Sequence, residues 1–148
     1  MNIRILKTLS SFFLFIFLSN ELLADQGISS DQILIGMHTD ISGPASMIGK
    51  QSVDGANMRF NEFNENGGAY NRKIKFIVED HQYTVPRAVQ AANKLLRKDK
   101  VAFMMGSLGT PMNNAVMTDQ LAMNVPNLFP LTAARSMFDP FDRLKFTS

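Results

Sequence analysis

The fold of this chain is decided by the stretch Ala102-Phe103-Met104-Met105-Gly106-Ser107-Leu108-Gly109-Thr110-Pro111. Its apolar first half is typical of a buried strand, and Gly106 and Gly109 then indicate a loop. Because Thr110 is a good helix N-cap and proline is favoured in a first helical turn, the loop should lead straight into a helix. The free N–H groups of a helix N-terminus favour a negative charge, so we predict an anion site here. The alternative is that the glycines only turn the chain and Thr110 only caps the helix.

The same order of strand, loop and helix recurs along the chain. Short apolar runs predict four strands, and apolar residues at helical spacing between them predict three helices. The expected strands cover residues 33–37, 74–78, 101–105 and 127–129, and the expected helices cover residues 53–63, 85–96 and 112–123. Strands alternating with helices of this length predict an α/β fold with a parallel sheet and flanking helices.

The loops that follow the strands should lie together. Crossover connections between parallel strands are almost always right-handed, so the carboxyl ends of the strands meet at one edge of the sheet. Ligands of open α/β sheets bind at that edge. The loops concerned cover residues 40–49, 80–84, 106–110 and 130–134.

The first 24 residues predict an export signal rather than part of the domain. Arg4 and Lys7 precede an apolar run over residues 9–18, and Leu22-Leu23-Ala24 offers a cleavage site. The run is shorter than the roughly 20 residues that cross a bilayer, although an uncleaved membrane anchor is the alternative. We therefore expect a cleaved signal peptide over residues 1–24 and an exported domain over residues 25–148.

Charge and composition exclude several classes of function. The chain has 15 Lys and Arg against 13 Asp and Glu, a net charge of +2 that falls to +1 without residues 1–24. Such a near-neutral domain gives no reason to expect nucleic acid as a partner. There is no cysteine, so disulfides and thiolate metal sites are excluded. His38 and His81 are the only histidines, and we expect neither a metal nor a cofactor.

Two further groups of side chains have a simple structural interpretation. Lys94, Arg97, Lys98 and Lys100 form a basic patch that is typical of a solvated helix end. Phe138, Phe141 and Phe146 are expected to pack in a late core cluster.

An ordered set of short motifs from about residue 33 to the last residue resembles a known family. The set includes Ser42-Gly43-Pro44, Asn66-Gly67-Gly68, Ala88-Val89-Gln90-Ala91-Ala92-Asn93-Lys94-Leu95, the Gly106 to Thr110 loop and the Asn127 to Ala134 segment. It resembles the opening of the periplasmic binding proteins of branched-chain amino acid ABC transporters. The resemblance implies two α/β lobes that close on a small ligand, of which this chain matches the first part of lobe one. It also implies that the chain is a fragment or a truncated product, and that residues 145–148 match the crossing into the second lobe.

The resemblance implies a set of ligand-binding positions, which here are Ile48, Gly109, Thr110, Leu131, Thr132 and Ala133. In the family, a hydroxyl and neighbouring N–H groups after the third strand hold the ligand α-carboxylate, and Thr110 and Gly109 lie at that place. Two residues after the fourth strand bind the ammonium and carboxylate groups. The family often has a hydroxyl at the position of Ala133, whereas here Thr132 carries it. Ile48 matches a residue, often aromatic, that touches the ligand side chain.

The leading hypothesis is the solute-binding component of an ABC importer that takes up a branched-chain or related amino acid, or an amide, and docks on a membrane permease. This function involves no catalysis. A ligand-sensing domain with the same fold is the first alternative. An exported hydrolase is less favoured because the chain has no Gly-x-Ser-x-Gly elbow. Its catalytic residues would be drawn from Ser107 or Thr110 as nucleophile, His38 or His81 as base, and Asp40 or Asp80 as orienting carboxylate.

Overall fold

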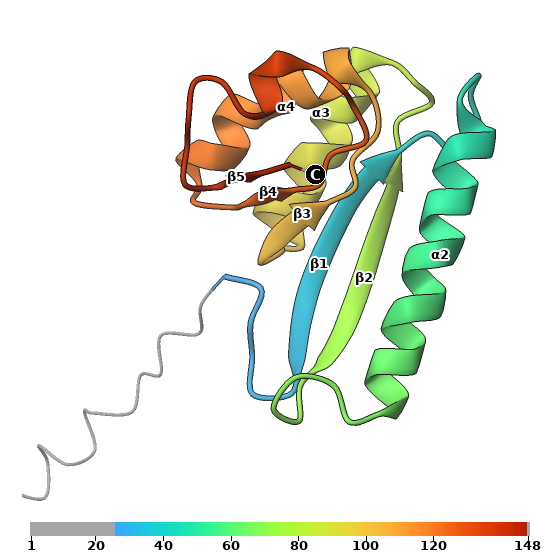
Figure 1. The fold of residues 1–148 in the computed structure, drawn as a ribbon, viewed down its shortest axis with the longest axis vertical. Coiled ribbons are helices and arrows are strands. Elements are labelled where there is room, and N and C mark those ends of the chain that lie inside the picture. Colours follow the sequence, from blue (N-terminus) through green and yellow to red (C-terminus); the bar gives the residue numbers. More distant parts are fainter. Residues whose placement is uncertain (1–25, 148) are drawn as a thin grey trace, which may run out of the picture.

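The computed structural model describes residues 26–147 and contains a five-stranded parallel sheet with helices on both faces (Figure 1). Its elements are β1 (Gln32–Thr39), α2 (Ser46–Glu65), β2 (Lys73–Asp80), α3 (Val85–Asn93), a π-helical turn η1 (Lys94–Lys98), β3 (Phe103–Met105), α4 (Thr110–Ala122), β4 (Asn127–Leu128), a 3-10 turn η2 (Arg135–Met137) and β5 (Lys145–Phe146). The strand order is β2-β1-β3-β4-β5, and all four neighbouring pairs are parallel. The predicted α/β class is therefore confirmed.

The strand count is one higher than predicted. β5 has only two residues, which is too few to show a period, and it exists because its backbone pairs with β4. The N–H of Phe129 donates to the carbonyl of Phe146 at 2.6 Å, and that of Asn127 donates to Leu144 at 2.8 Å. A strand of this kind is defined by a distant partner rather than by its own residues.

The main core lies between the sheet and the helices α3 and α4, which lie together on one side of it in Figure 1. Its buried residues are Ala92, Leu95, Leu96, Val101, Met104, Val116 and Val125. The Cβ of a residue at position 36 would approach Val101 and Leu95 within 3.1 to 3.3 Å, so the sheet packs closely at Gly36 on η1 and on the segment before β3. This layer fixes where β1 and β3 end, and hence where their loops begin.

The opposite face is covered by α2, which lies along β2 in Figure 1. Phe60 of α2 packs edge-on against Phe76 of β2, with 5.2 Å between ring centroids. Asn64 closes the outer edge of the sheet, because its amide donates to the carbonyl of Ile74 at 2.8 Å and accepts the N–H of Ile74 at 2.7 Å. Asn64 thus replaces a missing neighbouring strand at that residue.

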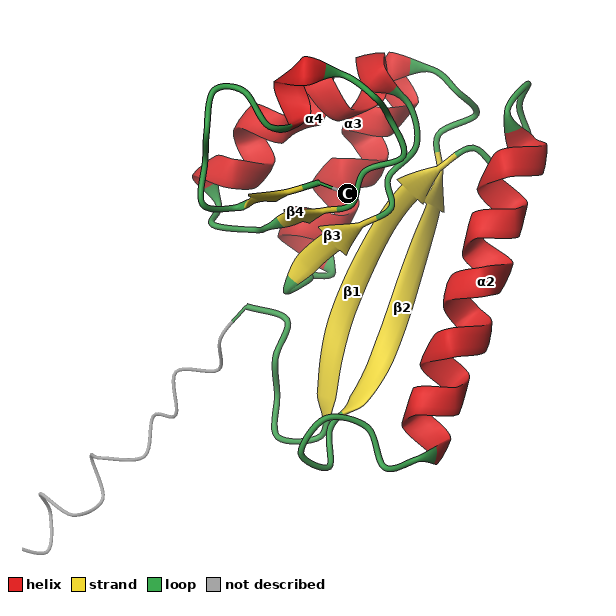
Figure 2. Cartoon of the chain, in the orientation of Figure 1, coloured by secondary structure: helices red, strands yellow, loops and turns green. Residues whose placement is uncertain are grey.

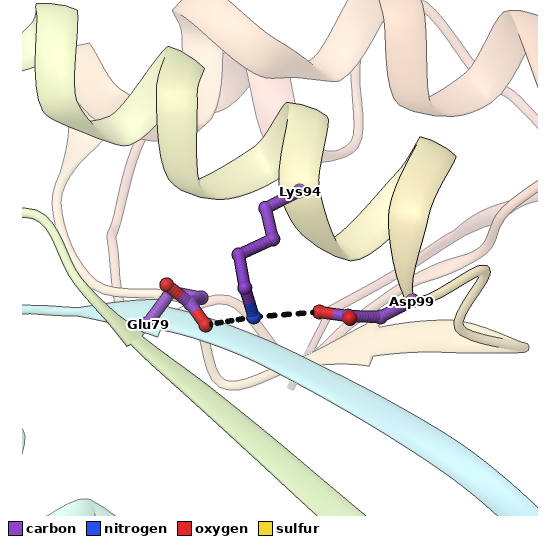
Figure 3. A network of polar contacts seen from close by, with 3 residues as sticks. All are labelled: Glu79, Lys94 and Asp99. Atoms are coloured by element: carbon purple, nitrogen blue, oxygen red, sulfur yellow. Dashed lines mark hydrogen bonds and ion pairs between the residues drawn. The ribbon is translucent and has the colours of Figure 1, made fainter.

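The basic patch was predicted to be a solvated helix end, but Lys94 makes ion pairs instead. The helix expected to run regularly through residues 85–96 changes at Lys94 into the π-helical turn η1. Figure 3 shows the ammonium of Lys94 between two carboxylates, at 2.5 Å from Glu79 and 2.9 Å from Asp99. These hydrogen bonds raise the pKa of Lys94. Lys94 therefore joins the end of β2 to the end of η1 instead of pointing freely into solvent.

The expected late core of phenylalanines is wrong. Phe138, Phe141 and Phe146 are all exposed, Phe141 to 89%, because the segment after β4 runs over the surface rather than under a helix. Among the described residues, no helix is both long and apolar enough to cross a membrane.

Candidate functional site

The loops after the strands do gather at the carboxyl edge of the sheet, as Figure 2 shows for the green segments above β1 and β2. Backbone hydrogen bonds tie them together. The N–H of Leu108 donates to His38 at 3.2 Å, and that of His81 donates to Thr39 at 2.8 Å. The N–H of Leu131 donates to Ser107 at 2.9 Å. The loops after β1, β2, β3 and β4 therefore form one connected surface.

Helix α4 begins at Thr110, two residues before the expected range of 112–123 and at the residue predicted to be its N-cap. Gly109 is its N-cap, with φ of 97°, and its carbonyl accepts the first helical hydrogen bond from the N–H of Asn113 at 3.0 Å. Thr110 is the first helical residue and makes no capping bond, so its prediction as N-cap is wrong. Glycine is favoured at position 109 because residues with a Cβ are strained at this positive φ. The amide of Asn113 instead holds the loop, through the carbonyls of Ser107 at 2.8 Å and Gly109 at 2.9 Å.

The Thr110 hydroxyl is released from capping and hydrogen-bonds the hydroxyl of Thr132. Thr132 also accepts the N–H of Ala134 at 3.2 Å, and the N–H of Gly109 donates to Leu131 at 3.2 Å. Four of the sequence-predicted positions, residues 109, 110, 131 and 132, are thus brought together. The hydroxyl that Ala133 lacks is supplied one residue earlier and meets Thr110.

The N-terminus of α4 has backbone N–H donors that the described residues leave unpaired. Pro111 has no N–H, and within residues 26–147 the N–H groups of Thr110 and Met112 have no hydrogen-bond acceptor. Thr110 is half-buried and Met112 is buried. Unpaired N–H groups beside two hydroxyls at a helix N-terminus form a surface suited to a carboxylate.

The remaining predicted positions lie around this group. Ile48 is in the first turn of α2 and is about half exposed, as is Leu131 to a smaller extent. No described contact joins the side chain of Ile48 to Thr110. Ala133 is exposed and lines a separate open hollow of about 540 Å³ with Arg135, Phe138, Asp139 and Phe141.

Two buried or partly buried carboxylates organise the loop after β1. Asp40 accepts the N–H groups of Gly43 at 2.5 Å and Ala45 at 2.7 Å. Asp80 accepts the hydroxyl of Ser42 at 2.6 Å and the N–H of Ile41 at 2.9 Å. Burial acts to raise the pKa of Asp80, but these hydrogen bonds outweigh it and the pKa is lowered. Both acids are therefore used in holding the backbone.

The two histidines lie next to each other, with ring centroids 5.5 Å apart. Both rings are buried, and within the described residues neither ring nitrogen of His38 has a hydrogen-bond partner. Burial, and secondarily the charge of His81, lower the pKa of His38 to about 3. Burial also lowers the pKa of His81, against the opposing effects of its hydrogen bond to Leu108 and of Asp40 and Asp80.

The low pKa of His38 links stability to pH. The unfolded chain takes up a proton near pH 6.5, whereas the folded chain does so only near pH 3. The unfolded state therefore binds more protons between these values, and stability falls as the pH drops. One such group costs about 2 kcal/mol between pH 7.5 and pH 5.

The geometry does not assemble the hydrolase alternative. The hydroxyl of Ser107 accepts the backbone N–H of His38 at 3.4 Å, and both ring nitrogens of His81 are engaged by backbone groups. No hydrogen bond joins a histidine ring to Ser107 or Thr110 in residues 26–147, although a nucleophile needs such a base. The same part of the chain contains no cluster of three or more metal-ligating side chains.

A comparison with protein families matches residues 32–139 to the family described as periplasmic binding protein. The chain belongs to this family. The resemblance seen in the sequence is therefore confirmed, and so is the expected parallel sheet with flanking helices. A comparison with curated proteins finds no match.

Solved structures support the same fold. The substrate-binding periplasmic protein of Ralstonia solanacearum has a TM-score of 0.73 at 24% identity, over 78% of this chain and 33% of its own. A "possible leucine/isoleucine/valine-binding protein" of Rhodopirellula baltica has a TM-score of 0.70 at 23% identity, over 77% and 30%. LivJ of Streptococcus pneumoniae is a branched-chain amino acid transporter substrate-binding protein in complex with isoleucine. It has a TM-score of 0.67 at 21% identity, over 72% of this chain and 31% of its own. The chain spans about a third of the length of these proteins.

Sequence reasoning missed how the loops are held. Asp40, Asp80 and His81 entered only as members of a hydrolase, and Asn113 was not singled out. An asparagine four residues after the glycine of a helix start is a local signal that points to Asn113. Asp40 bonds N–H groups three and five residues on in its own loop, whereas Asp80 and His81 also reach partners in other loops, Ile41 and Leu108, that their own neighbourhoods do not indicate.

Proposed function

We propose that this chain binds a small carboxylate at the carboxyl edge of its sheet, as part of the solute-binding component of an ABC importer. The ligand is an amino acid, branched-chain or related, or a similar amide. The observation that carries the proposal is the pair of hydroxyls on Thr110 and Thr132 beside the two unpaired N–H groups at the start of α4.

The surroundings of this group favour a ligand with an apolar part. Several large apolar side chains are exposed on the neighbouring loops and in the first turn of α2, namely Met47, Ile48, Tyr83, Phe129 and Leu131. Asp40 is buried and bonded to backbone N–H groups, so it does not oppose an incoming carboxylate directly. Family membership and the isoleucine reported for LivJ of Streptococcus pneumoniae support an amino acid as the ligand.

The site is tested by titrating the full chain with L-isoleucine while the amide signals of Thr110 and Met112 are followed by NMR. We expect these two signals to move, and L-isoleucinamide, which lacks the carboxylate, to bind more weakly. Thr110→Val keeps the shape of the side chain but removes the hydroxyl, and it should weaken binding about tenfold, the value of one hydrogen bond to a charged group.

Thr118→Val is the matched control, since Thr118 is an exposed residue of the same helix. It should leave the affinity unchanged. If Thr110→Val binds isoleucine as tightly as the unmodified chain, or if the moving signals lie away from α4, the carboxylate site has been placed wrongly.

We also propose that the protein is exported to the periplasm and delivers its ligand to a membrane permease. The export signal expected over residues 1–24 lies outside the described residues. N-terminal sequencing of the protein recovered from the periplasm should begin at Asp25. Retention in the cytoplasm with Met1 intact would contradict the proposal.

A further inference from the structure

We propose that His81 is the positioning residue of the binding loops, and that its uncharged ring holds the loop after β3 in the arrangement that receives the ligand. The inference deepens the proposed function and rests on it for the identity of the site. It adds a property that the family resemblance does not contain, which is control of the site by protonation of one buried side chain.

The first support is the pair of hydrogen bonds on the ring. Nδ1 of His81 lies 3.0 Å from the backbone nitrogen of Tyr83, and Nε2 lies 3.1 Å from the carbonyl oxygen of Leu108. Because a backbone N–H only donates and a carbonyl only accepts, Nδ1 must be bare and Nε2 must carry the proton. The ring is therefore neutral, and it joins the loop after β2 to the residue that precedes Gly109 and Thr110.

The second support is the backbone that the ring holds. The N–H of Thr84 donates to the carbonyl of His81 at 2.9 Å, which closes a tight turn over Gln82 and Tyr83. Both central residues lie in the left-handed region, with φ of 50° and 55°. Residues other than glycine stay there only when their surroundings impose it. The bond from the Tyr83 N–H to the ring of His81 is one such constraint.

The tight turn over Gln82 and Tyr83 lies next to the N-terminus of α4. A Cβ at Gly109 would lie 3.3 Å from Cε2 of the Tyr83 ring, so this ring packs against the residue next to Thr110. His81 is consequently connected to the site by two routes. Its ring bonds the carbonyl of Leu108, and it also bonds the backbone of Tyr83, whose own ring packs against Gly109. A change in its protonation would act on both sides of the N-terminus of α4.

The groups that face His81 define how it titrates. From the end of β1 come His38, with its ring 5.5 Å away, and Asp40, and from the end of β2 comes Asp80. Tyr83 lies 6.4 Å away, and the loop after β3 offers only the carbonyl of Leu108. The pKa of His81 is lowered and that of His38 is near 3, so His38 stays neutral above pH 5. Protonation of His81 places a second N–H against that of Tyr83 and removes its acceptor.

The test is an NMR titration of the full chain from pH 8 to pH 4.5. At pH 8 we expect the ring nitrogens of His81 to report a proton on Nε2 and none on Nδ1. On acidification the amide signals of Tyr83, Gly109 and Thr110 should move with the same midpoint as the ring. In His81→Gln, which keeps a donor toward Leu108 but does not titrate, this common midpoint should vanish. His38→Leu should retain it.

A second measurement tests whether protonation of the His81 ring changes the affinity for the ligand. The affinity for L-isoleucine should fall by up to about tenfold for each pH unit below the midpoint of His81, and His81→Gln should show no such fall in that range. A merely structural histidine would change the affinity of the variant without changing its pH profile.

The outcomes separate the two proposals. Amide signals that follow the ring, with no isoleucine bound at any pH, support the positioning role and overturn the proposed ligand. Isoleucine binding that ignores the protonation of His81 overturns the positioning role and leaves the site intact. A proton found on Nδ1 at pH 8 overturns it without any variant.

Discussion

Two glycines of the same helix offer a matched test of how the loop after β1 is held. Gly49 lies in the second turn of α2, and a Cβ there would be 1.9 Å from the carbonyl oxygen of Asp40 and 2.9 Å from the hydroxyl of Thr39. Gly55 lies in the middle of α2, and a Cβ there would meet nothing within 4 Å. Replacing each by alanine makes the same chemical change with and without a close neighbour.

The two effects have opposite signs. Alanine favours a helix interior over glycine by about 1 kcal/mol, so Gly55→Ala should raise the free energy of unfolding by about that amount. At position 49 the same gain is set against overpacking, which costs about 1–3 kcal/mol. The upper value applies because the neighbour is backbone, and because Asp40 is held by the N–H groups of Gly43 and Ala45. Gly49→Ala should therefore lower the free energy of unfolding by about 2 kcal/mol.

Urea unfolding of the full chain measures the difference. With a slope of about 2 kcal/mol/M, a gap of about 3 kcal/mol between the variants moves the unfolding midpoint by about 1.5 M. Midpoints that shift together and by equal amounts would show that Gly49 is not packed on Asp40. In that case the first turn of α2, which carries Ile48, would not be fixed to the end of β1.

The remaining predictions concern the histidine pair and the ion-pair network. His38→Leu removes a buried ring that has no hydrogen-bond partner among residues 26–147, so it should raise the free energy of unfolding at pH 7.5 by about 1–3 kcal/mol. By pH 5 this advantage should grow by about a further 2 kcal/mol, because the variant lacks the proton uptake of the unfolded His38; thermal melts at both pH values check the two effects. Lys94→Met should cost at most about 1 kcal/mol in low salt and less in 1 M salt, because Lys94 is partly exposed. Lys98→Met, an exposed residue of the same turn without an ion pair among the described residues, should cost nothing.

The periodic parts of the fold were predictable from their own residues. The alternation of apolar runs and helical spacing placed β1, α2, β2, α3 and α4, and hence the parallel sheet. β5 was not predictable, because a two-residue strand is defined only by hydrogen bonds to β4. The π-helical turn η1 was missed because the spacing of apolar residues does not show that the N–H of Asp99 reaches back five residues to the carbonyl of Lys94.

The candidate site was predictable only in part. Thr110 and Gly109 follow from the glycine loop before a helix, and the structure brings Thr132 onto Thr110. The position of the cap was wrong because the left-handed Gly109 already supplies the first helical acceptor. The role of His81 was hidden because its partners, Tyr83 and Leu108, make contact through backbone atoms, which every residue type carries.

The starts of α2 and α4 differ in a way that bears on the proposed ligand. The chain provides its own carboxylate just before α2, where Asp40 accepts the N–H groups of the loop residue Gly43 and of the N-cap residue Ala45. It provides none within residues 26–147 for the N–H groups of Thr110 and Met112 at the start of α4. Buried N–H groups in folded proteins nearly always have an acceptor. The loop before α2 is therefore held by a carboxylate of the chain itself, whereas the N–H groups at the start of α4 are left for the ligand carboxylate that we propose.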